Sequence, residues 1–129
     1  VPGAYLIEKT GSNRGARMAW VDLSPEAGSV QQLPDQAVLT GIPFSITDAT
    51  WDSSGKGALF LTYFGIYACQ EFSEGEGNCV TPGRPKRVWT GLLGQMETIL
   101  TGAPDRAVIA NEAGQFYEVT IDSRKSASN

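Results

Sequence analysis

Glycine and proline interrupt this chain so often that long helices have little room to form. The 129 residues include 15 Gly and 7 Pro, spread through the whole sequence. Breaks recur about every eight to twelve residues, and the runs between them are short and rich in β-branched and aromatic side chains. This spacing predicts an all-β fold built from short antiparallel strands.

The first expected element is a hairpin that joins residues 4–9 to 17–23 across the Gly-containing segment 11–15. In the last expected strand, 115–121, apolar and polar side chains alternate from Tyr117 onward, as in a half-buried strand. Further strands are expected at 36–40, 44–51, 57–64, 65–72, 87–90, 95–100 and 106–110. No linker interrupts the pattern, so we expect one all-β domain over residues 1–122 and a disordered C-terminal tail over 123–129.

A pattern of strands and turns recurs at an interval of about 50 residues. Between residues 41–79 and 91–129, the identities at this interval are Gly41 with Gly91, Tyr67 with Tyr117 and Ser73 with Ser123. The period and the strand order resemble the antiparallel units of β-propellers. Two full units and a partial one cannot close a propeller, so the chain would belong to a longer one or close by assembling with copies of itself. A β-trefoil, a β-sandwich and a small barrel are the alternatives.

Composition removes several function classes. The chain has no His, so it has no imidazole acid or base, no Ser-His-Asp triad and no His-ligated metal. Its formal net charge of -4 gives no general attraction to nucleic acid. Metal and phosphate-loop patterns are also absent from the sequence. We therefore expect no cofactor, no metal and no nucleic-acid partner.

The two cysteines, Cys69 and Cys79, are ten positions apart and flank a polar, Gly-containing segment. This spacing favours a disulfide that pins an exposed loop, although two separate buried thiols remain the alternative. A disulfide, together with a chain that begins with Val1 rather than Met, predicts a secreted or periplasmic protein. The longest apolar run, 58–69, is well short of the roughly 20 residues that span a membrane, so no membrane insertion is expected.

Without His, any acid-base catalysis must use carboxylates, Lys or Tyr. Asp48 and Asp52 flank Trp51 and are the best candidate pair for a hydrolase or lyase. The competing interpretation is structural, because Asp52 begins a turn and Asp48 lies in a strand. Ser53, Ser54 and Lys56 could form a Ser-Lys dyad, but turn chemistry accounts for all three more simply.

Aromatic and charged residues are the better candidates for binding. Trp51, Trp89 and Tyr67 could stack on the apolar face of a sugar or anchor a protein interface, although core packing would also explain them. The segment from Cys69 to Arg87 carries acidic residues before basic ones, and a solvated loop is the simplest explanation. The residues of this segment expected to face a partner are Glu74, Glu76, Arg84, Lys86 and Arg87.

These observations favour a binding module without enzymatic activity over a catalyst. Its partner would be a glycan or a protein, held by the aromatic residues and by the disulfide-pinned loop. The alternatives are a hydrolase or lyase that uses Asp48 and Asp52, and a structural subunit or protease-inhibitor-like protein. A homo-oligomer is possible under the propeller interpretation. That comparison concerns architecture only, so it assigns a role to no residue.

Overall fold

The computed structural model describes residues 3–9, 15–22, 28, 30, 37–73 and 78–121. The described residues form an all-β structure without a helix. The strands are β1 (Gly3–Ile7), β2 (Ala16–Asp22), β3 (Ala37–Leu39), β4 (Asp48–Trp51), β5 (Ala58–Leu61), β6 (Gly65–Cys69), β7 (Glu71–Ser73), β8 (Asn78–Thr81), β9 (Lys86–Thr90), β10 (Met96–Ala103), β11 (Arg106–Asn111) and β12 (Phe116–Thr120).

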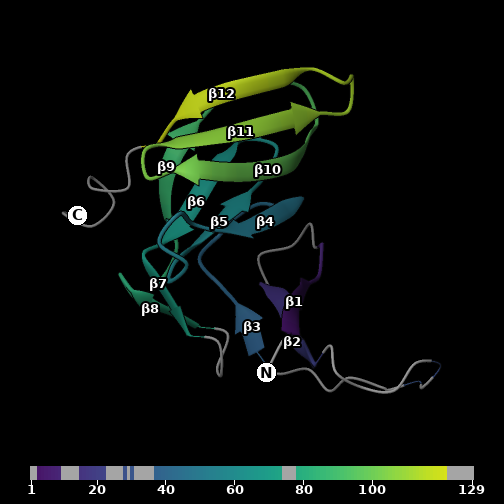
Figure 1. The fold of residues 1–129 in the computed structure, drawn as a ribbon, viewed down its shortest axis with the longest axis vertical. Helices are drawn as coiled ribbons and strands as arrows, with labels where there is room; N and C mark the ends of the chain where they lie inside the picture. The colour runs from purple at the N-terminus through teal and green to yellow at the C-terminus, as the bar shows by residue number, and fades with distance from the viewer. Residues whose placement is uncertain are drawn as a thin grey trace.

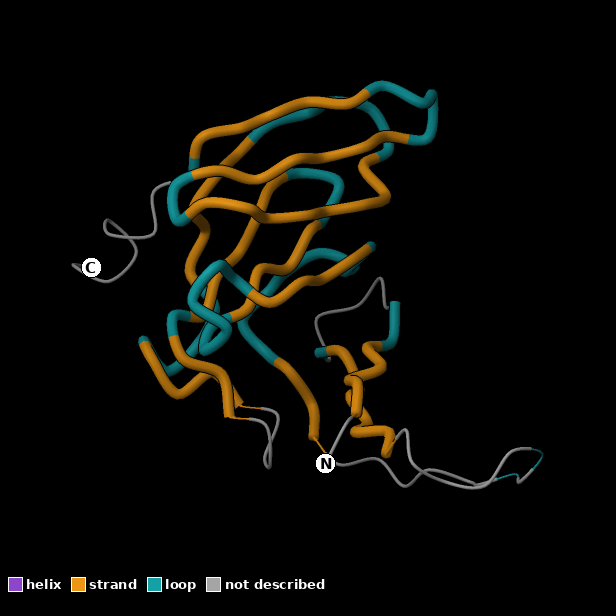
Figure 2. The backbone as a smooth tube through the Cα atoms, in the orientation of Figure 1, coloured by secondary structure: helices purple, strands orange, loops and turns teal. Residues whose placement is uncertain are grey.

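These strands are arranged in four antiparallel sheets (Figure 1). The N-terminal sheet has the order β1-β2-β3, the central sheet β4-β5-β6-β9 and the C-terminal sheet β10-β11-β12. Strands β7 and β8 form a separate two-stranded ribbon, which we call the disulfide hairpin. Figure 2 shows that mostly short loops join neighbouring strands, as expected for antiparallel connections.

The central sheet is buried on both faces, since every residue of β5 and β6 is buried. Successive side chains of a strand point to opposite faces, and here each face has its own hydrophobic cluster. Towards the N-terminal sheet, one cluster contains Ala16, Met18, Leu39, Ile42, Ile46, Ala58, Phe60, Tyr67, Cys69, Phe72 and Cys79. Towards the C-terminal sheet, the other contains Leu59, Leu61, Ile66, Ala68, Val88, Met96, Ile99, Ala107, Ile109, Val119 and Ile121. Residues 37–121 therefore centre on one sheet with packing on both sides.

Polar side chains hold the turns of two hairpins. Thr62, which is fully buried, accepts hydrogen bonds from the amides of Phe64 and Gly65 at 3.1 Å each. Asn111 plays the same part between β11 and β12, where its side-chain oxygen accepts a bond from the amide of Gln115 at 2.9 Å. Burial of these two polar residues is tolerated because their hydrogen-bonding groups are satisfied within the turn.

The expected all-β class and most of the expected strands are confirmed, including the alternation along β12. The strand expected at 44–51 is shorter, because only residues 48–51 pair with β5. The strand expected at 65–72 is divided into β6 and β7, which belong to different sheets, and β8 was not expected. The described residues form no closed propeller or barrel, so the 50-residue repeat stays a prediction. The tail, 123–129, lies outside the described residues.

Candidate binding groove

Trp51 ends β4 at the edge of the central sheet, where the chain turns sharply. The Asp52 carboxylate organises this turn by accepting hydrogen bonds from the amide of Ser54 at 2.9 Å and the amide of Gly57 at 3.3 Å. Gly57 is required there, because a Cβ at this position would lie 2.4 Å from the carbonyl oxygen of Cys69. The turn therefore fixes the backbone directly beside Trp51, whose side chain is 38% exposed.

The disulfide hairpin lies against this turn. Cys69, at the end of β6, is bonded to Cys79 in β8, which confirms the expected bridge. The amide of Phe72 in β7 donates to the carbonyl oxygen of Lys56 at 2.8 Å, so the hairpin is joined to the turn through the backbone as well. The sequence suggested an exposed loop between the cysteines, and the structure shows that β7 and β8 carry part of it as a paired ribbon.

A groove of about 440 Å³ opens between the turn and the disulfide hairpin. Its lining residues are Trp51, Gly55, Lys56, Glu71, Phe72, Ser73 and Val80. The ring of Phe72, which is only 6% exposed, contacts the Trp51 indole edge-on at a centroid distance of 6.1 Å. Because Phe72 also packs on the buried Phe60 at 5.9 Å, the aromatic wall of the groove is continuous with the core.

The groove combines a rigid aromatic wall with charged and hydroxyl groups. Lys56 and Glu71 are exposed at its margin, and Ser73 is half-buried. Ligand sites in proteins pair apolar surface with a few placed polar groups, and this groove has both. An arrangement of this kind can contact a ligand through both apolar surface and hydrogen bonds.

The other expected aromatic residues lie elsewhere. Tyr67 is 6% exposed and belongs to the core, so its ring is not on a binding surface. Trp89 is half-buried against the core cluster on the opposite face of the central sheet. Its ring closely covers Gly91, where a Cβ would lie 2.4 Å from the indole. Of the three expected aromatic contacts, the structure brings only Trp51 into the groove.

The basic residues expected to face a partner, Arg84, Lys86 and Arg87, do not line the groove. Lys86 and Arg87 lie in β9, which forms the edge of the central sheet opposite to β4 and Trp51. Arg84 is exposed in the connection that precedes β9. Glu74 and Glu76 fall outside the described residues. Sequence reasoning named neither Phe72 nor Lys56 as a binding residue, although Phe72 falls within the segment from Cys69 to Arg87 that was expected to face a partner.

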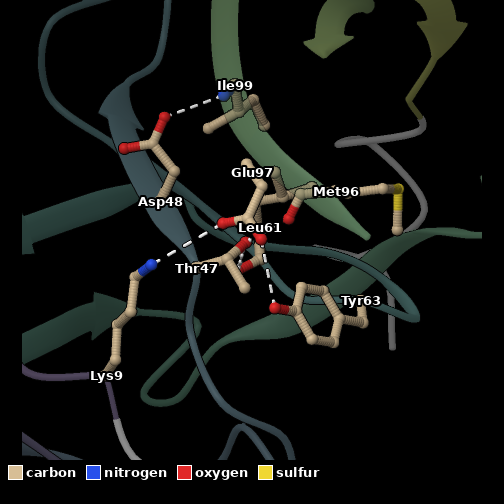
Figure 3. Close-up of polar contacts among 8 residues, drawn as sticks. All are labelled: Lys9, Thr47, Asp48, Leu61, Tyr63, Met96, Glu97 and Ile99. Atoms are coloured by element: carbon tan, nitrogen blue, oxygen red, sulfur yellow. Dashed lines mark hydrogen bonds and ion pairs between the residues drawn. The ribbon is translucent and has the colours of Figure 1, made fainter. Parts of the chain in front are cut away.

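Asp48 and Asp52 lie at opposite ends of β4 and are not brought together. Four residues of extended strand separate their Cα atoms by about 13 Å. Asp52 is engaged by the turn. Asp48 accepts a hydrogen bond from the amide of Ile99 in β10 at 2.8 Å (Figure 3). Both carboxylates therefore have structural partners, and their placement does not support a catalytic pair.

A second polar cluster surrounds Glu97, near the hydrogen bond between Asp48 and Ile99 (Figure 3). The hydroxyl of Tyr63 donates to the Glu97 carboxylate at 3.1 Å, and the Lys9 ammonium lies 3.6 Å from the other oxygen. The hydrogen bond to Glu97 raises the pKa of Tyr63 above its usual value of 10.0, with burial as the next cause. Close by, the Thr47 hydroxyl donates to the carbonyl oxygen of Met96 at 2.8 Å. These contacts join β10, an edge strand of the C-terminal sheet, to residues that flank β1, β4 and β5.

Over the described ranges, no group of three or more metal-ligating side chains occurs. A helix long and apolar enough to cross a membrane is likewise not found in the part of the chain that the structure describes. Comparison with known proteins identifies no relative: no family model, no curated protein and no solved structure matches this chain.

Proposed function

We propose that this protein is a carbohydrate-binding module that holds a sugar ring in the groove beside Trp51. The observation that carries the proposal is the pairing of a partly exposed indole with Lys56, Glu71 and Ser73 along one groove. An indole offers a flat apolar surface to the C–H face of a pyranose, and the polar side chains can bond its hydroxyl groups.

The rigidity of the groove supports binding over catalysis. Phe72 fixes the Trp51 ring from behind, and the disulfide and the turn fix the backbone on either side. A preformed site loses little conformational freedom when a ligand binds. The expected affinity is nevertheless modest, because a monosaccharide is small. About 12 heavy atoms, each contributing about 0.3 kcal/mol of binding free energy, give roughly 4 kcal/mol, or a Kd near 1 mM.

The disulfide also supports a location outside the cytosol. Cytosolic thiols are kept reduced, whereas secreted and periplasmic proteins keep such bridges. We place the protein in an oxidising compartment, where exposed glycans are abundant ligands.

Saturation-transfer NMR on the complete 129-residue chain tests the binding proposal, because it detects millimolar affinities. The probes are glucose, galactose, mannose, N-acetylglucosamine and the disaccharides cellobiose and chitobiose. We expect at least one to receive saturation at its ring C–H protons from the native chain. Trp51→Ala should lose that signal, while Phe116→Ala, which removes a 78% exposed aromatic ring from another sheet, should keep it.

Thermal unfolding of both variants accompanies the NMR experiment, since loss of the edge-on contact with Phe72 costs about 1 kcal/mol. A folded Trp51→Ala variant that binds as well as the native chain would overturn the proposal. So would a native chain to which none of the six sugars binds.

We also propose that the central and C-terminal sheets are two copies of one unit of about 50 residues, as in a propeller. Each begins with a three-stranded meander, β4-β5-β6 or β10-β11-β12. In each, a buried polar residue caps the turn between the second and third strands: Thr62 in one and Asn111 in the other. These two residues lie 49 positions apart (111 minus 62), close to the interval in the sequence.

A further inference from the structure

The outer face of the C-terminal sheet carries an uncovered apolar surface. Its exposed fractions are 60% at Leu100 in β10, 36% at Val108 in β11 and 78% at Phe116 in β12. The strand register places these residues close together, because Leu100 is opposite Val108, and Ala110 is opposite Phe116. The opposite face of the same sheet packs on the central sheet. The N-terminal, central and C-terminal sheets thus form a stack, and this outer face lies at one end of it.

The corresponding face of the central sheet is fully buried. The turn-capping residues give the correspondence: Leu61 directly precedes Thr62, and Ala110 directly precedes Asn111. Leu59 lies two residues before Leu61, and Val108 lies two residues before Ala110, so these two residues also correspond.

The cross-strand partners complete the match. Ile66 and Phe116 pair with Leu61 and Ala110 in their respective sheets. In the central sheet, this face packs against the C-terminal sheet, and Leu59, Leu61 and Ile66 are all at most 2% exposed. The outer face of the C-terminal sheet thus presents apolar residues at the positions that the central sheet uses to hold the next sheet.

The N-terminal sheet ends the stack on the other side and has an outer face of its own. Leu6 in β1 is 57% exposed and pairs with Ala19, and Val38 in β3 is 49% exposed and pairs with Arg17. Arg17 forms an ion pair with Glu8 at 2.7 Å on this face.

The C-terminal outer face has a matching pair, Arg106 with Glu118, at 3.2 Å. Among the described residues, each end of the stack therefore combines exposed apolar side chains with an Arg–Glu ion pair. Because the two ion pairs are of the same kind, the Arg of either face can also pair with the Glu of the other when the faces meet.

We propose that a second copy of this chain packs head to tail on the first, with the outer face of its N-terminal sheet against the outer face of the C-terminal sheet. This contact continues the interface already present between the central and C-terminal sheets. The contact joins two different surfaces, the C-terminal outer face of one copy and the N-terminal outer face of the other, so it is heterologous. The inference rests on the repeated unit proposed above and is independent of the sugar groove.

The contact area sets the expected strength. Three strands about 4.8 Å apart, with about five residues each at 3.4 Å, give a face of roughly 250 Å² and about 500 Å² buried in total. Stable dimers bury about 1,200–2,000 Å², so a single contact is weak. Association should therefore appear between about 10 µM and 1 mM, where weak complexes form.

Sedimentation velocity over that concentration range tests the inference on the complete chain. We expect the native protein to associate reversibly. Phe116→Glu and Leu6→Glu should each weaken association by at least about tenfold, because either one places an unpaired charge in the contact. Trp51→Ala, which alters neither face, is the matched control and should associate as the native chain does.

Mixing the two variants identifies the geometry. Phe116→Glu keeps an intact N-terminal face, and Leu6→Glu keeps an intact C-terminal face. An equimolar mixture should therefore restore one contact and stop at a dimer. Circular dichroism checks that both variants are folded. A native chain that stays monomeric to 1 mM, a mixture that does not associate, or folded variants that associate normally would each overturn the proposal, whatever the sugar-binding result.

Discussion

The hydrogen bond from Ile99 to Asp48 joins the central sheet to the C-terminal sheet, and its removal has a calculable cost. Asp48→Ala leaves the amide of Ile99 without this acceptor, at a residue that is only 1% exposed. An unsatisfied buried amide costs about 1–3 kcal/mol, so we expect a loss of about 2 kcal/mol in the free energy of unfolding. For a chain of 129 residues, with an unfolding entropy of about 2.1 cal/mol/K per residue, this loss lowers Tm by about 7 °C.

Asp48→Asn is the informative companion, because its side-chain oxygen can still accept the bond. It should cost less than about 1 kcal/mol, the difference between a charge-assisted and a neutral hydrogen bond. Asp105→Ala, in the exposed turn between β10 and β11, controls for the loss of a carboxylate. Urea unfolding measures all three variants. If Asp48→Ala and Asp105→Ala differ by less than about 0.5 kcal/mol, the structural role assigned to Asp48 is wrong.

Two further predictions concern the disulfide and the hydrogen bond between Tyr63 and Glu97. Replacing Cys69 and Cys79 together with Ala should lower the free energy of unfolding by about 3 kcal/mol, since the bridge closes an 11-residue loop; an unchanged urea midpoint would count against it. In an NMR titration with labelled tyrosine, Tyr63 should deprotonate above pH 10.0, and Glu97→Gln should move its pKa back towards that value. Because the folded-state pKa is raised, the stabilisation from this bond is complete at neutral pH and is lost as pH rises through the folded-state pKa. A Tyr63 titration unaffected by Glu97→Gln would show that the bond is absent in solution.

Local patterns were sufficient for the all-β class and most of the strands, and they favoured the disulfide over two separate thiols. The alternation in β12 followed from side chains at odd positions, and the turn at Asp52 followed from its polar and glycine residues. Such features depend on neighbours in the sequence, which the chain itself supplies.

The composition of the candidate groove was predicted only in part. Trp51 was expected on a binding surface because an indole near turn residues is often exposed. Tyr67 and Trp89 have the same side-chain chemistry, yet one is buried in the core and the other covers Gly91. Which aromatic residue is exposed depends on which sheet covers it, and strand periodicity carries no information about that.

The sequence by itself determined an all-β chain interrupted by turns, and it favoured a bridge between Cys69 and Cys79, because glycine, proline, alternation and cysteine spacing act over a few residues. Only the tertiary structure decided the partners across sheets. In the tertiary structure, the Asp48 carboxylate accepts a hydrogen bond from the amide of Ile99, and the ring of Phe72 packs edge-on against Trp51. These contacts join segments distant in sequence, and their geometry follows from the packing of whole sheets.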